Sequence, residues 1–273
     1  MTFTISEEEY DSLWREQNPS SHNDNLHLDD YEILKAFPKS LGQYGYIRCM
    51  ELFPGVWLNI FDCKSDRDLT RRIPAHEHEV QLMILSSGYS LYDEVYPTLG
   101  GKRSYLSGSG ISPAFQVKFS QPEHFSGIDI SIQPEVIDSF FPNLQDRNSA
   151  FAKVFLKQDE WKESFFPEVT PSMRTIVRQI TNPPYRGIAR KLYLQAKVLE
   201  LVAMQLDPIM TQFDASPTKS RLKPQTIDRI YQARDILTTR LDNPPSILEL
   251  AQQVAISDRF LARYGFNSRN NNL

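Results

Sequence analysis

Three histidines have the residue type, and part of the spacing, of metal ligands. His76 and His78 are separated by one residue just before an apolar run, and His124 lies near the end of a later predicted strand. Imidazole rings from two strands, completed by a carboxylate, form a common site for a transition metal. Positions four and five after His78 would have to supply that carboxylate, and they are Leu82 and Met83.

The neighbouring acidic residues do not complete this site. Glu77 and Glu79 alternate with the histidines, so on a strand they point to the opposite face. We therefore expect a polar loop that leads into a buried strand, with no bound metal. A metal or a ferric chelate held by His76, His78 and His124 is the alternative.

A second candidate for function lies near the C-terminus, in SILELAQQVAISDRFLARYGF (246–266). Ser246 and Glu249 have the spacing of a capping box, in which each residue satisfies a backbone N–H of the other. Ala255 and Ile256 form a turn, and Ser257 can cap a second helix. The pattern indicates a helix-turn-helix, although an ordinary helical hairpin has the same features.

In a helix-turn-helix, the second helix enters the major groove of DNA with its first residues at the base edges. Arg259 and Arg263 lie one turn apart and can reach guanine edges or phosphates. We expect the DNA-binding residues to be Ser257, Asp258, Arg259, Ala262 and Arg263.

The distribution of charge agrees with a polyanionic partner at this end. The 273 residues carry a net charge of −4, but residues 221–273 hold 8 Lys and Arg against 5 Asp and Glu, which gives +3 there and −7 elsewhere. No apolar segment is long enough to cross a bilayer, and the first residues lack a signal-peptide pattern. We expect a cytoplasmic protein in which Cys49 and Cys63 are unpaired thiols.

The elements that must position these residues change in type along the chain. Short β-branched and aromatic runs separated by turn residues predict a small barrel or sandwich. The expected strands are 46–52, 56–63, 80–85, 89–95, 103–106, 116–119 and 125–132. A helix is expected near 7–16, and helical spacing dominates after Pro134.

The helix expected over 187–206 has an unusually broad apolar surface. One stripe holds Ile188, Leu192, Ala196, Leu199, Ala203 and Leu206, and Leu194, Val198 and Leu201 lie beside it. Such a helix packs against the barrel, against another helix or against a second subunit. The sequence leaves these possibilities open.

The segment LKPQTIDRIYQARDILTTRLDNPPSILELAQQVAISD resembles the opening of an AraC/XylS-type DNA-binding domain, in the subgroup similar to the pyochelin-siderophore regulator. The stretches NPPYRGIARKLYLQAKVLELVAMQL and YLSGSGISPAFQV are similar to the linker helix and the N-terminal domain of that subgroup. The resemblance implies a cupin-like β-barrel that senses a small ligand, helices that support a homodimer, and two helix-turn-helix units. Only about 50 residues follow Leu222, so we expect a chain truncated after the first unit.

We predict an α+β protein with four parts. These are a polar segment (1–43), a cupin-like β-barrel with supporting or dimerisation helices (44–213), a linker (214–220) and an incomplete all-α helix-turn-helix domain (221–273). The predicted function is transcription regulation, with promoter DNA and a small effector as partners, the effector being an iron-siderophore by resemblance. A metal-dependent cupin-type enzyme that uses the three histidines is the rival, and a regulator fragment that no longer binds DNA is the third possibility.

Overall fold

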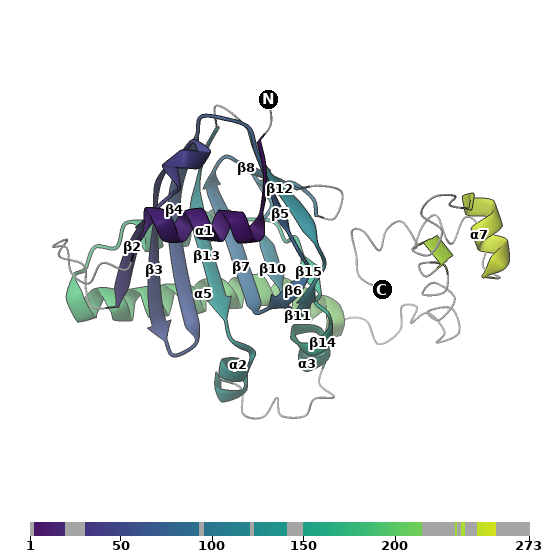
Figure 1. Ribbon diagram of the computed structural model, residues 1–273. Coiled ribbons are helices and arrows are strands. Elements are labelled where there is room, and N and C mark those ends of the chain that lie inside the picture. The colour runs from purple at the N-terminus through teal and green to yellow at the C-terminus, as the bar shows by residue number, and fades with distance from the viewer. Residues whose placement is uncertain are drawn as a thin grey trace. The chain divides into compact units, whose positions relative to one another are not determined.

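The computed structural model describes residues 3–19, 31–92, 96–120, 123–140, 150–214, 233, 236–237 and 245–254 (Figure 1). Contacts between residues divide the chain into two compact units. The first unit holds residues 1–93 and 97–211, and the second holds 94–96 and 212–273. Each unit is described by itself.

A seven-stranded sheet forms the centre of the first unit. Its strand order is β15 (Ser164–Phe165), β10 (Tyr105–Ser107), β7 (Val80–Ser87), β13 (Glu123–Ile132), β4 (Val56–Ser65), β3 (Gln43–Phe53) and β2 (Glu32–Ala36). The hairpin β3–β4 turns at Pro54-Gly55, where Gly55 has a φ of 76°, a conformation that favours glycine. Each of the seven predicted strands has a counterpart in the structure. Five lie in this sheet or overlap it as β3, β4, β7, β10 and β13, and two lie in another sheet as β8 (Tyr89–Tyr92) and β12 (Phe115–Phe119).

Two smaller sheets adjoin the seven-stranded one. One has the order β1 (Phe3–Ser6), β5 (Leu69–Ile73), β12 (Phe115–Phe119), β8 (Tyr89–Tyr92) and β9 (Leu99–Gly100). The other has the order β14 (Leu156–Trp161), β11 (Ser109–Ser112) and β6 (His76–His78). The short strands β1, β2, β5, β6, β11 and β14 lack a strong alternating pattern, and the sequence did not predict them.

The mixed α+β class is confirmed, but the predicted closed barrel is wrong for the described residues. Closure would require the two outermost strands of a sheet to pair. In the seven-stranded sheet these are β15 and β2, and no pairing joins them within the described ranges. Ile33 and Leu34 of β2 are exposed. The structure has open sheets that pack face to face with helices and with one another.

The side chains of each strand alternate between two faces of the seven-stranded sheet. The outer face is apolar and packs against helices α4 (Pro171–Thr181) and α5 (Gly187–Asp214). The buried residues of this core include Leu58, Leu82, Ile128 and Ile130 of the sheet, Met173, Ile176, Val177 and Ile180 of α4, and Leu194, Val198, Leu201 and Ile209 of α5. Figure 1 shows α5 behind the sheet and α1 in front of it.

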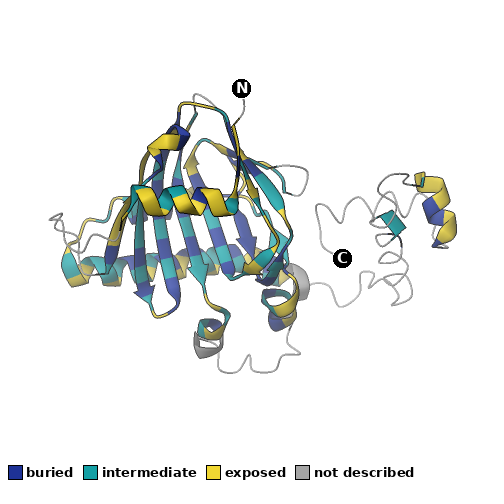
Figure 2. Ribbon diagram, viewed as in Figure 1, coloured by how far each residue is buried: buried dark blue, intermediate teal, exposed yellow. Residues whose placement is uncertain are grey.

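The opposite, inner face is aromatic at one end. Phe61, Leu85 and Phe125 pack there with Phe37 and with Trp14 of helix α1 (Glu7–Gln17). Ser6 caps α1 in a capping box with Glu9. Buried and half-buried residues alternate along the strands of the sheet (Figure 2). On the inner face the residues at this end are buried, whereas Asn59, Gln81 and Asp129 at the other end are half-buried. The remaining short helices of the unit are η1 (Lys39–Leu41), α2 (Pro134–Phe140) and α3 (Ala150–Phe155).

The second unit is described only around helix α7 (Ile247–Gln253). The predicted capping box is confirmed, since the Glu249 backbone N–H donates to Ser246 Oγ and Glu249 Oε2 accepts from the Ser246 N–H at 2.8 Å. Leu250, Ala251 and Val254 are buried together with Ala233. Among the described residues, no helix combines the length and apolar character needed to span a membrane.

Candidate functional site

A row of polar side chains crosses the inner face at the end opposite the aromatic residues. Gln81 Nε2 of β7 donates to Asp129 Oδ1 of β13 at 2.7 Å, and Asn59 Nδ2 of β4 donates to Asp129 Oδ2 at 3.3 Å. Asn59 and Asp129 lie directly opposite each other in the β4–β13 register. All three residues keep some exposed surface, so solvent reaches this half of the inner face.

The Asp129 carboxyl group has an unusual proton affinity. Burial raises its pKa from 3.8 to about 6, although the hydrogen bonds from Gln81 and Asn59 favour the charged form and act in the opposite direction. The whole Asp129 residue is only half-buried. The hydration of its carboxyl group is limited because this group lies between strands. The sequence itself marks this residue. Asp129 stands between Ile128 and Ile130, and a carboxylate is unusual inside an apolar strand.

Lys162 adds a second buried ionisable group. It follows β14 directly and is 5% exposed, and its backbone N–H donates to the Ile111 carbonyl at 3.0 Å. Its Nζ donates to the Tyr105 hydroxyl and to Ser164 Oγ, the latter at 3.2 Å. Burial lowers the Lys162 pKa from 10.5 to about 7. Nothing in the local sequence signalled this lysine, because its burial depends on strand pairing.

A glycine permits the close packing that places Lys162. Gly110 of β11 has a φ of 129°, and a Cβ at this position would lie 2.6 Å from the Glu160 carbonyl oxygen. Only glycine tolerates both that conformation and that approach. Gly110 also pairs with His78 of β6, so β11 lies between the histidine strand and the segment that carries Lys162.

The structure brings two of the three predicted metal ligands together and separates the third. His78 Nδ1 lies 3.3 Å from His76 Nε2. His124 instead contacts Asp62 Oδ1 at 2.9 Å, and it pairs with Lys64 at the end of β13 far from the Val80 end of β7. The prediction that His76, His78 and His124 could form one site is therefore wrong. Within the described ranges, no group of three or more His, Cys, Asp or Glu residues is placed to hold a metal.

His78 is held neutral by its surroundings. Burial lowers its pKa from 6.5 to about 3, and the nearby charges of Lys162 and His76 act in the same direction. Where His76 is neutral and donates from Nδ1 to the Pro74 carbonyl, at 2.9 Å, its Nε2 must accept from His78 Nδ1. His78 Nε2 is then an unprotonated acceptor.

Two buried polar atoms of this region have no hydrogen-bond partner. They are His78 Nε2 and Ser107 Oγ. The Gln81 amide approaches His78 and favours its charged form slightly, yet no donor or acceptor is within range of Nε2. Ser107 is fully buried and pairs with Gln81 in the β10–β7 register. Buried polar atoms that lack partners are costly, and a bound molecule can satisfy them.

The inner face therefore combines the features of a small-molecule site. It offers an acceptor at His78, a hydroxyl at Ser107, ionisable groups at Asp129 and Lys162, and an aromatic cluster at the other end of the same strands. Sites for small molecules typically pair apolar walls with a few such polar groups.

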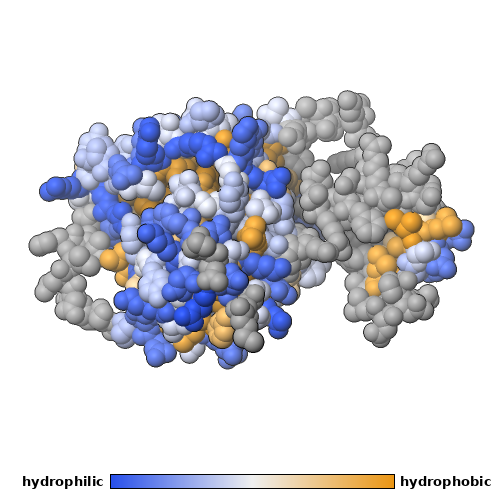
Figure 3. Space-filling model, turned by 90° about the horizontal axis from the view of Figure 1, so that it is seen from above, coloured by the Kyte–Doolittle hydropathy of each residue, from blue (hydrophilic) through white to orange (hydrophobic). Residues whose placement is uncertain are grey.

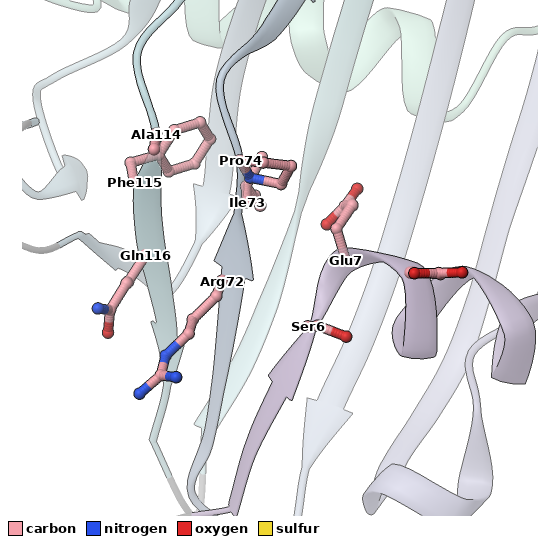
Figure 4. A pocket seen from close by; sticks show the side chains of 9 residues that line it. Ser6, Glu7, Arg72, Ile73, Pro74, Ala114, Phe115 and Gln116 are labelled. Atoms are coloured by element: carbon pink, nitrogen blue, oxygen red, sulfur yellow. The ribbon is translucent and has the colours of Figure 1, made fainter.

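A second hollow lies on the surface beside α1. This open groove, of about 570 Å³, is formed where β1, β5 and β12 meet the start of α1 (Figure 4). Its lining includes Arg72, Gln116 and Phe115, and Glu7 at its margin forms an ion pair with Arg71. Seen from above, the first unit is largely hydrophilic with small hydrophobic areas between (Figure 3). Because no unpaired buried polar atom lines this groove among the described residues, the inner face is the better candidate.

The sequence of the first unit identifies the family. Residues 41–223 match the family described as "Regulatory protein PchR N-terminal domain", which is more than half of the chain. The chain belongs to this family. The matched range contains the whole seven-stranded sheet except β2, and it contains the polar residues of the inner-face site, His78, Ser107, Asp129 and Lys162.

Individual relatives are more distant. The chain is 33% identical over 91 residues to the regulatory protein PchR of Pseudomonas aeruginosa, a match that covers 33% of this chain and 30% of that protein. Two structures of ToxT from Vibrio cholerae, one with bound unsaturated fatty acid, are 9% identical. They cover 76% and 82% of this chain and 77% and 76% of theirs, with TM-scores of 0.31 and 0.37. These scores are low, and neither likeness establishes a function.

The predicted DNA-binding residues fall outside the described ranges. Ser257, Asp258, Arg259, Ala262 and Arg263 all follow Val254, the last described residue. Their assignment, the domain limits and the predicted truncation stay predictions.

Proposed function

We propose that this protein regulates transcription in the manner of AraC-type regulators, with a small effector bound on the inner face of the first unit and promoter DNA bound by the C-terminal segment in the cytoplasm. The family match supports the regulator class. The observation that carries the effector site is the pair of unpartnered buried atoms, His78 Nε2 and Ser107 Oγ, on a face that solvent partly reaches.

The effector should match the chemistry of that face. An O–H or N–H donor satisfies His78 Nε2, an acidic group is attracted to Lys162, and an aromatic ring packs on the phenylalanine cluster. A siderophore has aromatic rings and acidic groups, and we propose that class as the effector. Because iron binding removes the proton of a phenol, the donor to His78 Nε2 must be an O–H or N–H group that does not coordinate the iron. Binding would then shift the populations of states that differ in the order or orientation of the DNA-binding segment.

Titration of the purified protein with a phenolic siderophore, with and without iron, tests this proposal. Trp57 lies on β4 two residues before Asn59, so its fluorescence provides an intrinsic probe. Ser107→Ala should weaken binding by about tenfold, the loss expected for one hydrogen bond to a ligand. Ser87→Ala, an exposed change at the other end of the neighbouring strand, is the control. Equal affinity of the two variants would contradict the site.

DNA binding requires a separate test. The protein should bind DNA from upstream of its own gene with an affinity that falls as salt rises, because phosphate contacts release counterions. Arg259→Ala and Arg263→Ala should each weaken binding about tenfold or more, as expected for loss of a base or phosphate contact. Arg15→Ala on α1 is the charge-matched control. Absence of binding by the unmutated protein at low salt would reject this part of the proposal.

The enzymatic alternative has lost its main support. It required three histidines around one metal, and the structure places His124 away from His76 and His78. Metal analysis of the purified protein provides the direct check. Stoichiometric iron or zinc that is lost in His76→Ala would restore the enzyme hypothesis.

A further inference from the structure

Residues 169–199 have an unusual charge for this chain. They contain six Lys and Arg residues and no Asp or Glu. The six are Arg174, Arg178, Arg186, Arg190, Lys191 and Lys197. The rest of the chain holds 24 Lys and Arg against 34 Asp and Glu, so it carries −10 in a protein whose net charge is −4. Cations concentrated in one segment of an acidic protein are typical of a surface that binds a polyanion.

Half of these cations are already engaged within the first unit. Arg190 and Lys197 form ion pairs with carboxylates, and Lys191 lies over an aromatic ring. The other three, which include Arg174 and Arg178 of α4, are exposed. Among the described residues, no carboxylate forms an ion pair with these three. Their positive charge is therefore available to a partner.

Helix α4 presents the two arginines on one face. Its four buried apolar residues pack against the sheet, so the residues between them point away from the core. Arg174 and Arg178 are four positions apart, which places them one above the other on this exposed face. The exposed hydroxyl groups of Ser172 and Thr175 lie on the same helix. Arginine, serine and threonine side chains are common ligands of nucleic-acid phosphates.

A loop from the sheet extends this face at the start of α4. Arg174 donates to the Gly101 carbonyl oxygen, and the Lys102 carbonyl oxygen accepts at 2.8 Å from a backbone N–H two residues before α4. These bonds hold exposed Lys102 and Arg103 beside the helix. Glu168 is 3.9 Å from Lys102, and this exposed pair offsets one of the positive charges. Lys102, Arg103, Arg174 and Arg178 are called the α4 basic face below.

We propose that the α4 basic face binds the phosphate backbone of double-stranded DNA, in addition to the contacts of the C-terminal segment. The inference rests on the DNA binding proposed above and adds that the first unit itself holds DNA. Guanidinium groups donate paired hydrogen bonds to phosphate oxygens, which an exposed arginine without a carboxylate partner can do. Phosphate contacts contain no base information, so this face should bind promoter and unrelated DNA alike.

The composition of the α4 basic face favours DNA over a lipid surface. Helices that lie on membranes combine cations with large apolar side chains that insert between the lipids. The large apolar residues of α4 are buried against the sheet, and its exposed face has none. Electrostatic contact with a polyanion is the interaction that remains.

The salt dependence of DNA binding by the full chain tests the inference. Arg174→Gln with Arg178→Gln should weaken binding to upstream DNA and to a scrambled duplex alike. The slope of log affinity against log salt should become shallower by about 2, because each phosphate contact contributes about 0.9. Arg15→Gln with Lys64→Gln removes the same charge from exposed positions of α1 and β4, and this control should keep the original slope. Circular dichroism verifies that both variants are folded.

Photo-cross-linking locates the contact. A benzophenone attached to Thr175→Cys, between the two arginines, should cross-link to DNA, whereas one attached to Ser12→Cys on the exposed side of α1 should not. Native Cys63 is buried and Cys49 is half-buried, so the treated unmutated protein supplies the background. An unchanged salt slope in the Arg174 and Arg178 variant, or equal cross-linking from both positions, would overturn the inference.

The results separate this inference from the proposed function. If the slope falls in the Arg174 and Arg178 variant while Arg259→Ala and Arg263→Ala bind as before, the α4 basic face stands and the predicted C-terminal contacts fail. If only the C-terminal changes weaken binding, the regulator stands and the α4 basic face does not bind DNA. If the unmutated protein binds neither duplex at low salt, both fail. Binding to phosphatidylserine vesicles that is lost in the Arg174 and Arg178 variant would then identify a membrane as the partner.

Discussion

Gln81 and Asp129 lie on neighbouring strands and share a hydrogen bond of 2.7 Å in the middle of the inner face. Because burial holds the Asp129 pKa near 6 rather than 3.8, the folded protein binds this proton more tightly than the unfolded chain does. The stability that Asp129 contributes is fully present below pH 3.8 and is lost as pH rises through about 6.

Asp129→Asn should remove this pH dependence. Relative to the unmutated protein, the variant should gain about 1 to 2 kcal/mol in free energy of unfolding between pH 4 and pH 7. A shift of one pKa unit corresponds to about 1.4 kcal/mol. Urea titrations across this pH range measure the difference. The same change at exposed Asp159 of β14 should leave the pH profile unaltered. If the free energy of unfolding of Asp129→Asn differs from that of the unmutated protein by the same amount at every pH, the Asp129 carboxyl group is well hydrated.

Lys162 should impose the opposite pH dependence at higher pH. Its folded pKa of about 7 lies below the ordinary 10.5, so between these values the unfolded chain binds the proton that the folded protein has released. Stability should therefore rise with pH over this range. Lys162→Met should abolish the rise, and Lys118→Met, on the exposed side of β12, should preserve it. Denaturant unfolding at pH values of about 7 and about 10 makes the comparison.

Phe155 should be among the most costly side chains to truncate. It is fully buried and stacks on Phe151, with ring centroids 4.9 Å apart, and on Phe165 at 5.5 Å. Phe155→Ala should reduce the free energy of unfolding by about 3 to 5 kcal/mol, because a cavity remains where the ring was. Trp161→Ala, which removes an aromatic ring 53% exposed on the adjacent strand, should cost less than about 1 kcal/mol. Similar losses in the two variants would contradict the packing described.

The two capping boxes provide matched tests of the two units. Ser246→Ala should weaken α7 by about 1 kcal/mol, and Ser6→Ala should weaken α1 by a similar amount. Hydrogen exchange should accelerate at the Leu250 amide in the first variant only, since this amide donates to the Ser246 carbonyl at 2.9 Å. Acceleration there in Ser6→Ala as well would show that the units do not open independently.

Much of the secondary structure could be predicted from local pattern. The apolar and aromatic runs of β4 and β13 were expected as strands, and β3 and β4 form a hairpin at Pro54-Gly55, between two of the expected strands. Helix α1 was expected over 7–16 and runs to Gln17. Short strands such as β6 and β11 could not be predicted, because three or four residues contain too little periodicity and are ordered by their partners.

The candidate site was only partly visible in the sequence. His76 and His78 were singled out, but for metal binding rather than as a buried neutral pair. Lys162 and Ser107 gave no signal, since a lysine or serine is ordinarily a surface residue and only pairing with distant strands buries it. Asp129 could have been noticed, because a carboxylate within an alternating apolar strand requires an explanation.

The sequence by itself determined the alternating strands, the capping boxes and the two apolar stripes of α5, because each depends on residues within a few positions of one another. The tertiary structure decided which stripe of α5 meets the sheet and left Leu192 and Leu199 exposed. It also decided that His124 lies apart from His78 and that Lys162 reaches Tyr105. These outcomes depend on strand register and on which surfaces bury the most apolar area, and both are settled only when segments far apart in the chain pack together.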